Sequence, residues 1–139
     1  KELPFNIQDQ TIFYVGPTPS KPGQVFGSGG PTTSGRMDAY SPRLIKLGLH
    51  AMIGKGYRNE AVKKAIVDHC GVYCGAIGGA GAMMSSCIEE CEVIAFDDLG
   101  PEAIRKLKVK NMPLVVVIDH LGNDLYEIGR KNYLKKDCK

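Results

Sequence analysis

Short runs of β-branched and aromatic residues alternate with stretches of helical periodicity along this chain, and this alternation constrains the fold most strongly. Strands are predicted at residues 11–15, 50–53, 72–77, 93–96, 114–118 and 125–128, and the run 114–118 is expected to be the most buried. Helices are predicted between them, over residues 37–47, 59–69, 81–86 and 101–107, with Asn59 as an N-cap. Strands that alternate with helices at such short intervals indicate an α/β domain with a partly parallel sheet.

Length and charge limit the class of protein. The chain has 139 residues, 43% of them hydrophobic, which is typical of one globular domain over residues 1–139. Its longest apolar run, residues 114–118, is far shorter than the ~20 residues that span a bilayer, so no membrane association is expected. The net charge of +3 is evenly spread, and the basic residues 130–139 are interpreted as a solvated tail, so no nucleic-acid partner is expected.

The cysteines form an odd set of five, at positions 70, 74, 87, 91 and 138. Because no secretory signal precedes them, the odd count favours reduced thiols and a cytoplasmic protein. The first four have the spacing C-x3-C, twelve residues, C-x3-C, with looser ligand pairs than the usual C-x2-C of a zinc site. Cys74 also lies in an apolar, strand-like run, where a free cysteine commonly serves as a small hydrophobe. A zinc-stabilised interaction domain is one hypothesis.

Residues 16–35 form a long segment rich in glycine and proline, which is either a linker or a structured functional loop. P-loop, dinucleotide-binding and nucleophile-elbow patterns all fail in this chain. In G-S-G-G-P-T-T-S-G-R-M-D, glycines allow close backbone approach to a ligand, and Thr33 or Ser34 is expected to cap the helix that follows. Arg36 offers a planar fork for a carboxylate or phosphate, and Asp38 is able to hold a neighbouring backbone group or the arginine itself.

Two interpretations of this segment stay open on the residues alone. One is an anion pocket built from helix-start amides, two hydroxyls and Arg36, which a stand-alone anion-binding module would also contain. The other is a surface loop with a capped helix, in which Arg36 forms a structural salt bridge. Lys55 lies between two glycines after a short strand, and it is either a ligand contact at a strand end or an exposed turn lysine.

The whole segment G-S-G-G-P-T-T-S-G-R-M-D-A-Y, residues 27–40, closely resembles a motif of the iron–sulfur-dependent (class I) fumarases and L-tartrate dehydratases. The resemblance is to their β-type, C-terminal domain, which in two-subunit members is a separate chain. Further matches keep the family's order: Y-V-G-P, I-G-K-G, I-G-G-A, L-G-P-E-A-I and D-H-L-G-N-D, at residues 14–17, 53–56, 77–80, 99–104 and 119–124. The resemblance therefore extends through most of the chain.

This resemblance implies a swivelling β/β/α domain with a mixed sheet. It implies a hydro-lyase that reversibly hydrates fumarate to malate, a step of the tricarboxylic acid cycle, or that dehydrates L-tartrate to oxaloacetate. It also implies a [4Fe–4S] cluster bound by an α-type partner subunit, no metal in this chain, and no activity without that partner. Thr32 matches the threonine proposed as catalytic base, Thr33 and Arg36 match contacts to the substrate carboxylates, and Lys55 matches the lysine that also binds the substrate.

One departure from the family concerns the start of the chain. Family members carry an Arg-Asp-x-x-His motif before this point, whose arginine also binds substrate, and nothing in this sequence matches it. The sequence therefore predicts a single domain that lacks its N-terminal segment and one substrate arginine. An interface left open without the α-type partner also leads us to expect self-association, as a homodimer, of the isolated chain.

Overall fold

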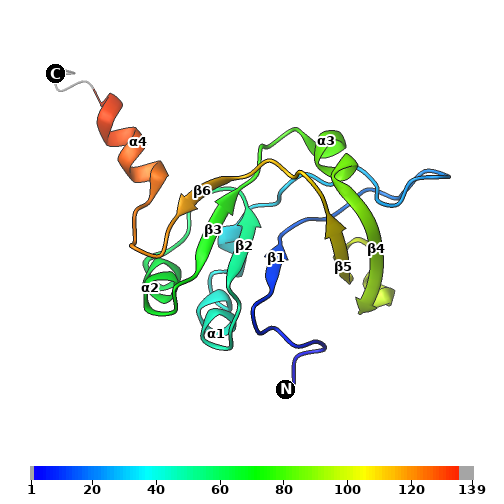
Figure 1. Cartoon of the computed structure of the whole chain (residues 1–139), viewed down its shortest axis with the longest axis horizontal. Coiled ribbons are helices and arrows are strands. Elements are labelled where there is room, and N and C mark those ends of the chain that lie inside the picture. The colour runs from blue at the N-terminus through cyan, green and yellow to red at the C-terminus, as the bar shows by residue number, and fades with distance from the viewer. Residues whose placement is uncertain (1, 135–139) are drawn as a thin grey trace.

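The computed structural model describes residues 2–134, and its centre is a four-stranded mixed sheet (Figure 1). The strands are β1 (Thr11–Phe13), β2 (Ala51–Gly54), β3 (Val72–Gly75) and β6 (Val115–Ile118), in the order β1-β2-β3-β6. The first three run parallel, and β6 pairs antiparallel with β3. The prediction of a single α/β domain with a partly parallel, mixed sheet is confirmed.

Two helices cover one face of this sheet, because alternate strand residues point towards them. α1 (Ser41–Lys46) and α2 (Glu60–Asp68) lie side by side at the lower left of Figure 1. Register pairing joins Ile12, Met52, Tyr73 and Ile118 in one row across the four strands. This row and the two helices share one core, whose buried members are Ile7, Tyr14, Ile45, Leu49, Met52, Val62, Ala65, Ile66, Tyr73, Val117 and Ile118.

The helix starts agree with the sequence at one place and differ at another. Asn59 caps α2 as predicted, since its side-chain oxygen accepts a hydrogen bond from Val62 N at 2.9 Å. The helix predicted over residues 37–47 is split in two. A short 3-10 helix, η1 (Ser34–Met37), comes first, and α1 begins at Ser41.

The opposite face of the sheet carries a smaller core, and a second sheet follows it along the chain. Phe13, Ile53 and Cys74 pack there with Met84 of α3 (Gly81–Ser86). Beyond α3, the strands β4 (Ile88–Ala95) and β5 (Ile104–Val109) pair as an antiparallel ribbon. This ribbon stands apart from the main sheet at the right of Figure 1. The strand predicted at residues 93–96 is therefore present but begins earlier, at Ile88.

The helix predicted over residues 101–107 is wrong. A 3-10 segment, η2 (Asp97–Glu102), precedes β5, and inside it Gly100 has a φ of +56°, which interrupts any helical continuation. The strand then pairs with β4 along its length, with Lys108 Nζ donating to Glu90 Oε1 at 2.7 Å. Pairing with β4, which is distant from this segment in the sequence, thus overrides the helical spacing of the apolar residues in 101–107.

The strand predicted at residues 125–128 is also wrong, because this segment begins α4 (Leu125–Tyr133). Asp124 caps this helix, and its Oδ1 accepts a hydrogen bond from Tyr126 N at 3.0 Å. Residues 130–133 of the basic stretch therefore belong to a helix, and the remainder from residue 135 lies outside the described residues.

The run 114–118 forms a strand, but it is not the most buried one. Val115 and Val116 are 51% and 53% exposed, while Val117 and Ile118 are buried. The physical reason is position, because β6 is the last strand of the main sheet and has a neighbour on one side only.

Candidate functional site

The glycine-rich segment closes over the carboxyl ends of β1 and β2. Thr32 N donates to the carbonyl of Tyr14, just beyond β1, at 2.8 Å. Lys55, directly after β2, donates its N–H to the carbonyl of Thr32 at 3.3 Å, and Ser34 N donates to the carbonyl of Lys55 at 3.0 Å. Thr33 and Lys55 are thereby partners in a parallel bridge. The backbone brings together three of the four predicted site residues, Thr32, Thr33 and Lys55.

Arg36 is the fourth predicted residue, and it lies in η1, three positions after Thr33. The side chains of Arg36, Thr33 and Lys55 are exposed, and Thr32 is half-buried. Neither Arg36 nor Lys55 forms an ion pair with another described residue. The alternative interpretation, a structural salt bridge at Arg36, is therefore not supported by residues 2–134. Both positive charges are available to an anion that arrives from outside.

Two glycines let the site close. A β-carbon on Gly54 would collide with the hydroxyl oxygen of Ser34, so only glycine lets the loop lie against the end of β2. A β-carbon on Gly81 would lie 2.6 Å from Ser28 Oγ, where the loop meets the start of α3. Beside them, a β-carbon on Gly78 would lie 4.0 Å from Lys55 Cδ. The stem of Lys55 therefore runs next to the turn that follows β3.

The expectation that Thr33 caps the following helix through its side chain is wrong. Thr33 occupies the N-cap position of η1 with extended dihedral angles, but its side chain makes no capping hydrogen bond. The first amide of η1, that of Ser34, donates to the carbonyl of Lys55. The alternative cap, Ser34, is fully buried, and its hydroxyl is bonded to Tyr73 instead.

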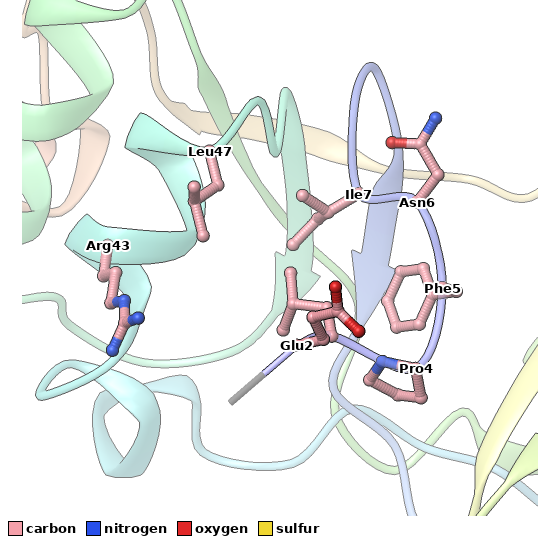
Figure 2. A pocket seen from close by; sticks show the side chains of 8 residues that line it. Glu2, Pro4, Phe5, Asn6, Ile7, Arg43 and Leu47 are labelled. Carbon is pink, nitrogen blue, oxygen red and sulfur yellow. The ribbon is translucent and has the colours of Figure 1, made fainter.

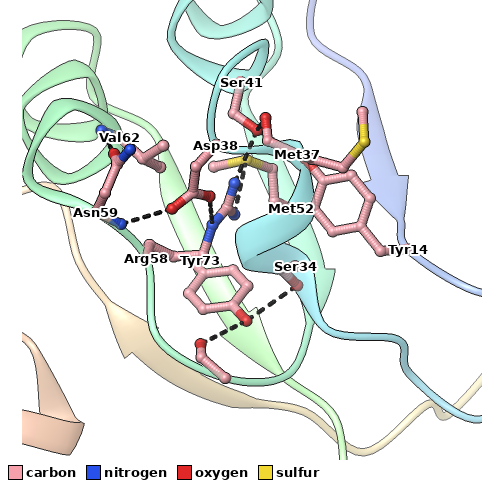
Figure 3. A network of polar contacts seen from close by, with 11 residues as sticks. Tyr14, Ser34, Met37, Asp38, Ser41, Met52, Arg58, Asn59, Val62 and Tyr73 are labelled. Atoms are coloured by element: carbon pink, nitrogen blue, oxygen red, sulfur yellow. Dashed lines mark hydrogen bonds and ion pairs between the residues drawn. The ribbon is translucent and has the colours of Figure 1, made fainter.

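A buried arginine lies beneath this surface, and sequence reasoning missed it (Figure 3). Arg58 is 3% exposed. Its Nε donates to Asp38 Oδ1 at 2.6 Å, its Nη2 to Ser41 Oγ at 2.7 Å, and its Nη1 to Met52 Sδ at 3.4 Å. The sequence predicts that Asp38 holds a backbone group or Arg36. Its Oδ2 accepts from the backbone amide of Asn59 at 2.6 Å, and the arginine that it holds is Arg58, not Arg36.

Tyrosine rings enclose the same guanidinium. Arg58 Cζ lies 5.0 Å from the ring centre of Tyr73 and 5.5 Å from that of Tyr14, within the range of cation–π attraction. The Tyr73 hydroxyl is hydrogen-bonded to both Ser34 Oγ and the carbonyl oxygen of Gly56, each at 3.1 Å. Burial raises the pKa of Tyr73, while the hydrogen bond to Ser34 and the charge of Arg58 oppose that rise. The phenol is therefore neutral and able to donate at neutral pH.

A surface pocket lies elsewhere, between the N-terminal segment and α1 (Figure 2). It has a volume of about 590 Å³ and is lined by residues 2–7 together with Arg43 and Leu47. None of the four predicted site residues lines it. The threonines, Arg36 and Lys55 instead present an open surface at the strand ends.

The described cysteines give the zinc hypothesis no support. Cys70, Cys74, Cys87 and Cys91 are free, and residues 2–134 contain no group of three or more His, Cys, Asp or Glu side chains able to hold a metal ion. Cys138 lies outside the described residues. Burial raises the pKa of Cys74, as expected for a thiol that packs as a small hydrophobe in β3.

Among residues 2–134, no helix is both long and apolar enough to cross a bilayer.

Comparison with known proteins gives relatives over nearly the same length of chain. The chain is 41% identical over 129 residues to "Fumarate hydratase class I, anaerobic" of Escherichia coli K12, covering 91% of this chain and 24% of that protein. It is 38% identical over 126 residues to "Fumarate hydratase 2" of Leishmania major, covering 89% and 22%. The chain thus spans about a quarter of the length of these fumarate hydratases.

A third relative is a shorter protein. The chain is 37% identical over 142 aligned positions to "Putative L(+)-tartrate dehydratase subunit beta" of Methanocaldococcus jannaschii, covering 97% of this chain and 73% of that protein. The family model described as Fumarase C-terminus matches residues 1–129. Because that match covers nearly the whole chain, and the relatives cover it equally well, the chain belongs to the fumarase C-terminal domain family.

Proposed function

We propose that this chain is the β-type part of a hydro-lyase that reversibly hydrates fumarate to malate together with an α-type partner. The observation that carries the proposal is the Thr33–Lys55 bridge, which holds both threonines against Lys55 at the carboxyl ends of two parallel strands. Ligands of α/β folds bind at this edge of the sheet. The family to which the chain belongs includes fumarate hydratases, which supports the substrate class.

The charges at the site suit a dicarboxylate. Arg36 offers two parallel N–H donors to one carboxylate, and Lys55 offers a point charge on a flexible stem. Both side chains are exposed, and neither has to break an ion pair within the described residues in order to bind a carboxylate. In the proposal, Arg36 and Thr33 contact substrate carboxylate oxygens, and Lys55 provides the second cation.

The same cations assist proton transfer. Removing a proton next to a carboxylate builds enolate-like negative charge, which fixed positive groups stabilise. Thr32 is the proposed base, and its backbone is fixed on both sides by hydrogen bonds to Tyr14 and Lys55. A threonine hydroxyl is a weak base, so it requires activation by an adjacent group, for which we propose a carboxylate of the partner.

The iron–sulfur cluster is assigned to the partner. Residues 2–134 do not assemble three metal-ligating side chains, so this part of the chain does not fit as the holder of a [4Fe–4S] cluster, and none of these residues is proposed as a ligand. The free state of its described cysteines is compatible with the proposed cytoplasmic location.

The proposal is tested by anaerobic reconstitution. The chain is mixed with the cluster-bearing chain, and loss of fumarate absorbance is compared with that of each chain alone; activity is expected in the mixture only. Arg36→Ala should abolish turnover while the circular dichroism spectrum is retained. Arg43→Ala is the matched control, because Arg43 is also an exposed arginine but lies on α1 and not in the proposed site. Full activity of Arg36→Ala would remove Arg36 from the site.

L-tartrate is the second candidate substrate. It is favoured by the tartrate dehydratase β-subunit relative, whose length this chain covers to 73%. The same mixture is assayed with L-tartrate, and oxaloacetate is detected by coupled reduction. A stand-alone anion-binding module, in contrast, would give heat with fumarate in calorimetry of the chain without its partner. Binding heat without turnover in any mixture would favour that module.

A further inference from the structure

One buried hydroxyl touches both sides of the Thr33–Lys55 bridge. Tyr73 lies in β3 with no exposed surface, and its hydroxyl is 3.1 Å from Ser34 Oγ and 3.1 Å from the carbonyl oxygen of Gly56. Ser34 directly follows Thr33, and Gly56 directly follows Lys55. The phenol of Tyr73 therefore joins the two segments one residue beyond the paired site residues (Figure 3).

A second tyrosine fixes the other end of the threonine pair. The carbonyl of Tyr14 accepts from Thr32 N at 2.8 Å, and the Tyr14 hydroxyl is 3.2 Å from Ser41 Oγ. The segment from Thr32 to Ser34 is thus held at its start by Tyr14 and at its end by Tyr73. Lys55 is bonded between these two points.

Arg58 joins the two tyrosines. Its guanidinium lies between the Tyr73 and Tyr14 rings, and Asp38 and Ser41 fix its direction through bonds of 2.6 and 2.7 Å. A buried ion pair generally adds little net stability compared with apolar side chains of the same volume. Its placement directly beneath the bridge therefore suits a role in orientation.

We propose that Tyr73, with its ring held by Arg58, is a positioning residue for the proposed reaction. Its hydroxyl sets the separation between the threonine pair and Lys55 without touching the substrate. This inference rests on the proposed function. A displacement of about 1 Å at reacting groups is able to lower a rate about 100-fold, so loss of this clamp between Ser34 and Gly56 should have a measurable effect.

The first test uses Tyr73→Phe, which keeps the ring over Arg58 and removes only the clamp. We expect kcat of the reconstituted enzyme to fall about 10- to 100-fold. Ile66→Val, in the fully buried part of α2, is the control for lost stability, with a melting temperature lowered by about 2–5 °C and kcat unchanged. Equal kcat in the two variants would overturn the proposal.

The second test asks whether the hydroxyl acts through Ser34. Ser34→Ala should lower kcat, and adding it to Tyr73→Phe should lower kcat no further, because both changes remove the same hydrogen bond. If the losses of kcat in the two single variants add in the double variant, the Tyr73 hydroxyl does not act through Ser34. If the Tyr73–Ser34 hydrogen bond had a structural role alone, the two substitutions would be coupled in the melting temperature and not in kcat.

The third test does not depend on turnover. In the ¹⁵N-labelled chain, hydrogen exchange at the amides of Ser34 and Lys55 reports the bridge itself, because both amides bond across it. Tyr73→Phe should speed exchange at both amides, and Ile66→Val should not. Unchanged exchange in Tyr73→Phe refutes the clamp. If the unaltered enzyme acts on neither fumarate nor L-tartrate, the proposed function is overturned, and the exchange result still decides the clamp.

Discussion

The ammonium of Lys63, on α2, lies 2.9 Å from Oδ2 of Asp124, the residue that caps α4. Asp124 is buried, and its contact with the Lys63 ammonium is what compensates the charge of this oxygen. Burial would lower the pKa of Lys63, but hydrogen bonds to Glu127, Asp124 and Glu60 raise it above its ordinary value. α4 contains no buried residue, so this ion pair links it to α2 in addition to the packing of the partly buried Tyr126 on the core.

Lys63→Met is therefore expected to release α4. The substitution leaves the Asp124 carboxylate buried and uncompensated, which weakens the helix cap. Trypsin should cleave faster after Arg130 and Lys131, as followed by mass spectrometry. Lys64→Met is the control, because Lys64 is exposed and its ion pair within residues 2–134 is with Asp68 of its own helix. Equal cleavage rates in both variants would contradict the role of Lys63.

The same tie has a defined pH dependence. The folded-state pKa of Lys63 is higher than its ordinary value of 10.5, so its stabilising contribution is complete below that pH. It is lost only as the pH rises towards the folded-state value.

Alkaline pH should also act through Tyr73. Burial raises the pKa of its phenol above the ordinary value of 10.0, so the unfolded chain releases this proton first. Ionisation of Tyr73 therefore leaves the free energy of unfolding unchanged below pH 10 and lowers it above pH 10. In urea titrations between pH 8 and 11, Tyr73→Phe should show a shallower decline than the unaltered chain. Tyr40→Phe, an exposed tyrosine, is the matched control, and a decline equal to it would contradict the prediction.

The sequence predicted the parts of this molecule that depend on local residue chemistry. Asn59 caps α2 because a side-chain oxygen reaches an amide three residues away, and Lys55 follows directly after a strand between two glycines. The segment 104–109 became a strand because its partner is β4, which no local window contains. The segment from residue 125 is a helix that Asp124 caps, and an aspartate directly before the segment is a local signal for such a helix start.

The polar interior of the site was not predictable in the same way. Arg58 binds Asp38 and Ser41 from positions 20 and 17 residues away, and Tyr73 reaches Ser34 across 39 residues. No spacing rule joins such positions. A charged residue beside a helix cap is ordinarily solvated, so burial of Arg58 becomes evident only when β2, β3 and the loop are assembled.

The Arg58–Asp38 pair should be costly to break on one side. Arg58→Met leaves the 8%-exposed Asp38 without its cation and should lower the free energy of unfolding by about 3–5 kcal/mol in urea denaturation. Adding Asp38→Asn should recover part of this loss, because a neutral amide needs no charge partner and still accepts from Asn59 N. Arg43→Met, on the surface, should stay within about 0.5 kcal/mol. No recovery in the double variant would argue against charge as the cause.

Gly54 and Ser34 should show compensating substitutions. Gly54→Ala places a methyl group against Ser34 Oγ and should lower the free energy of unfolding by about 1–3 kcal/mol, as overpacked sites do. Adding Ser34→Ala removes the colliding oxygen, so thermal denaturation should show partial recovery. Recovery stays incomplete because the new carbon would still lie 3.2 Å from Ser34 Cβ and from Tyr14 Cδ2. A double variant less stable than Gly54→Ala alone would contradict this contact.

Lys55 offers the sharpest test of the proposed site, because its backbone and its side chain have separate roles. The backbone forms the bridge to the threonines in any variant, so Lys55→Ala should leave the melting temperature unchanged. Loss of one charged hydrogen bond to the substrate, about 1.5–3 kcal/mol, should lower kcat/KM by about 10- to 150-fold. Lys46→Ala removes an exposed lysine at the end of α1 and controls for net charge. If Lys55→Ala and Lys46→Ala lower kcat/KM equally, Lys55 acts through the net positive charge of the protein and not as a substrate contact.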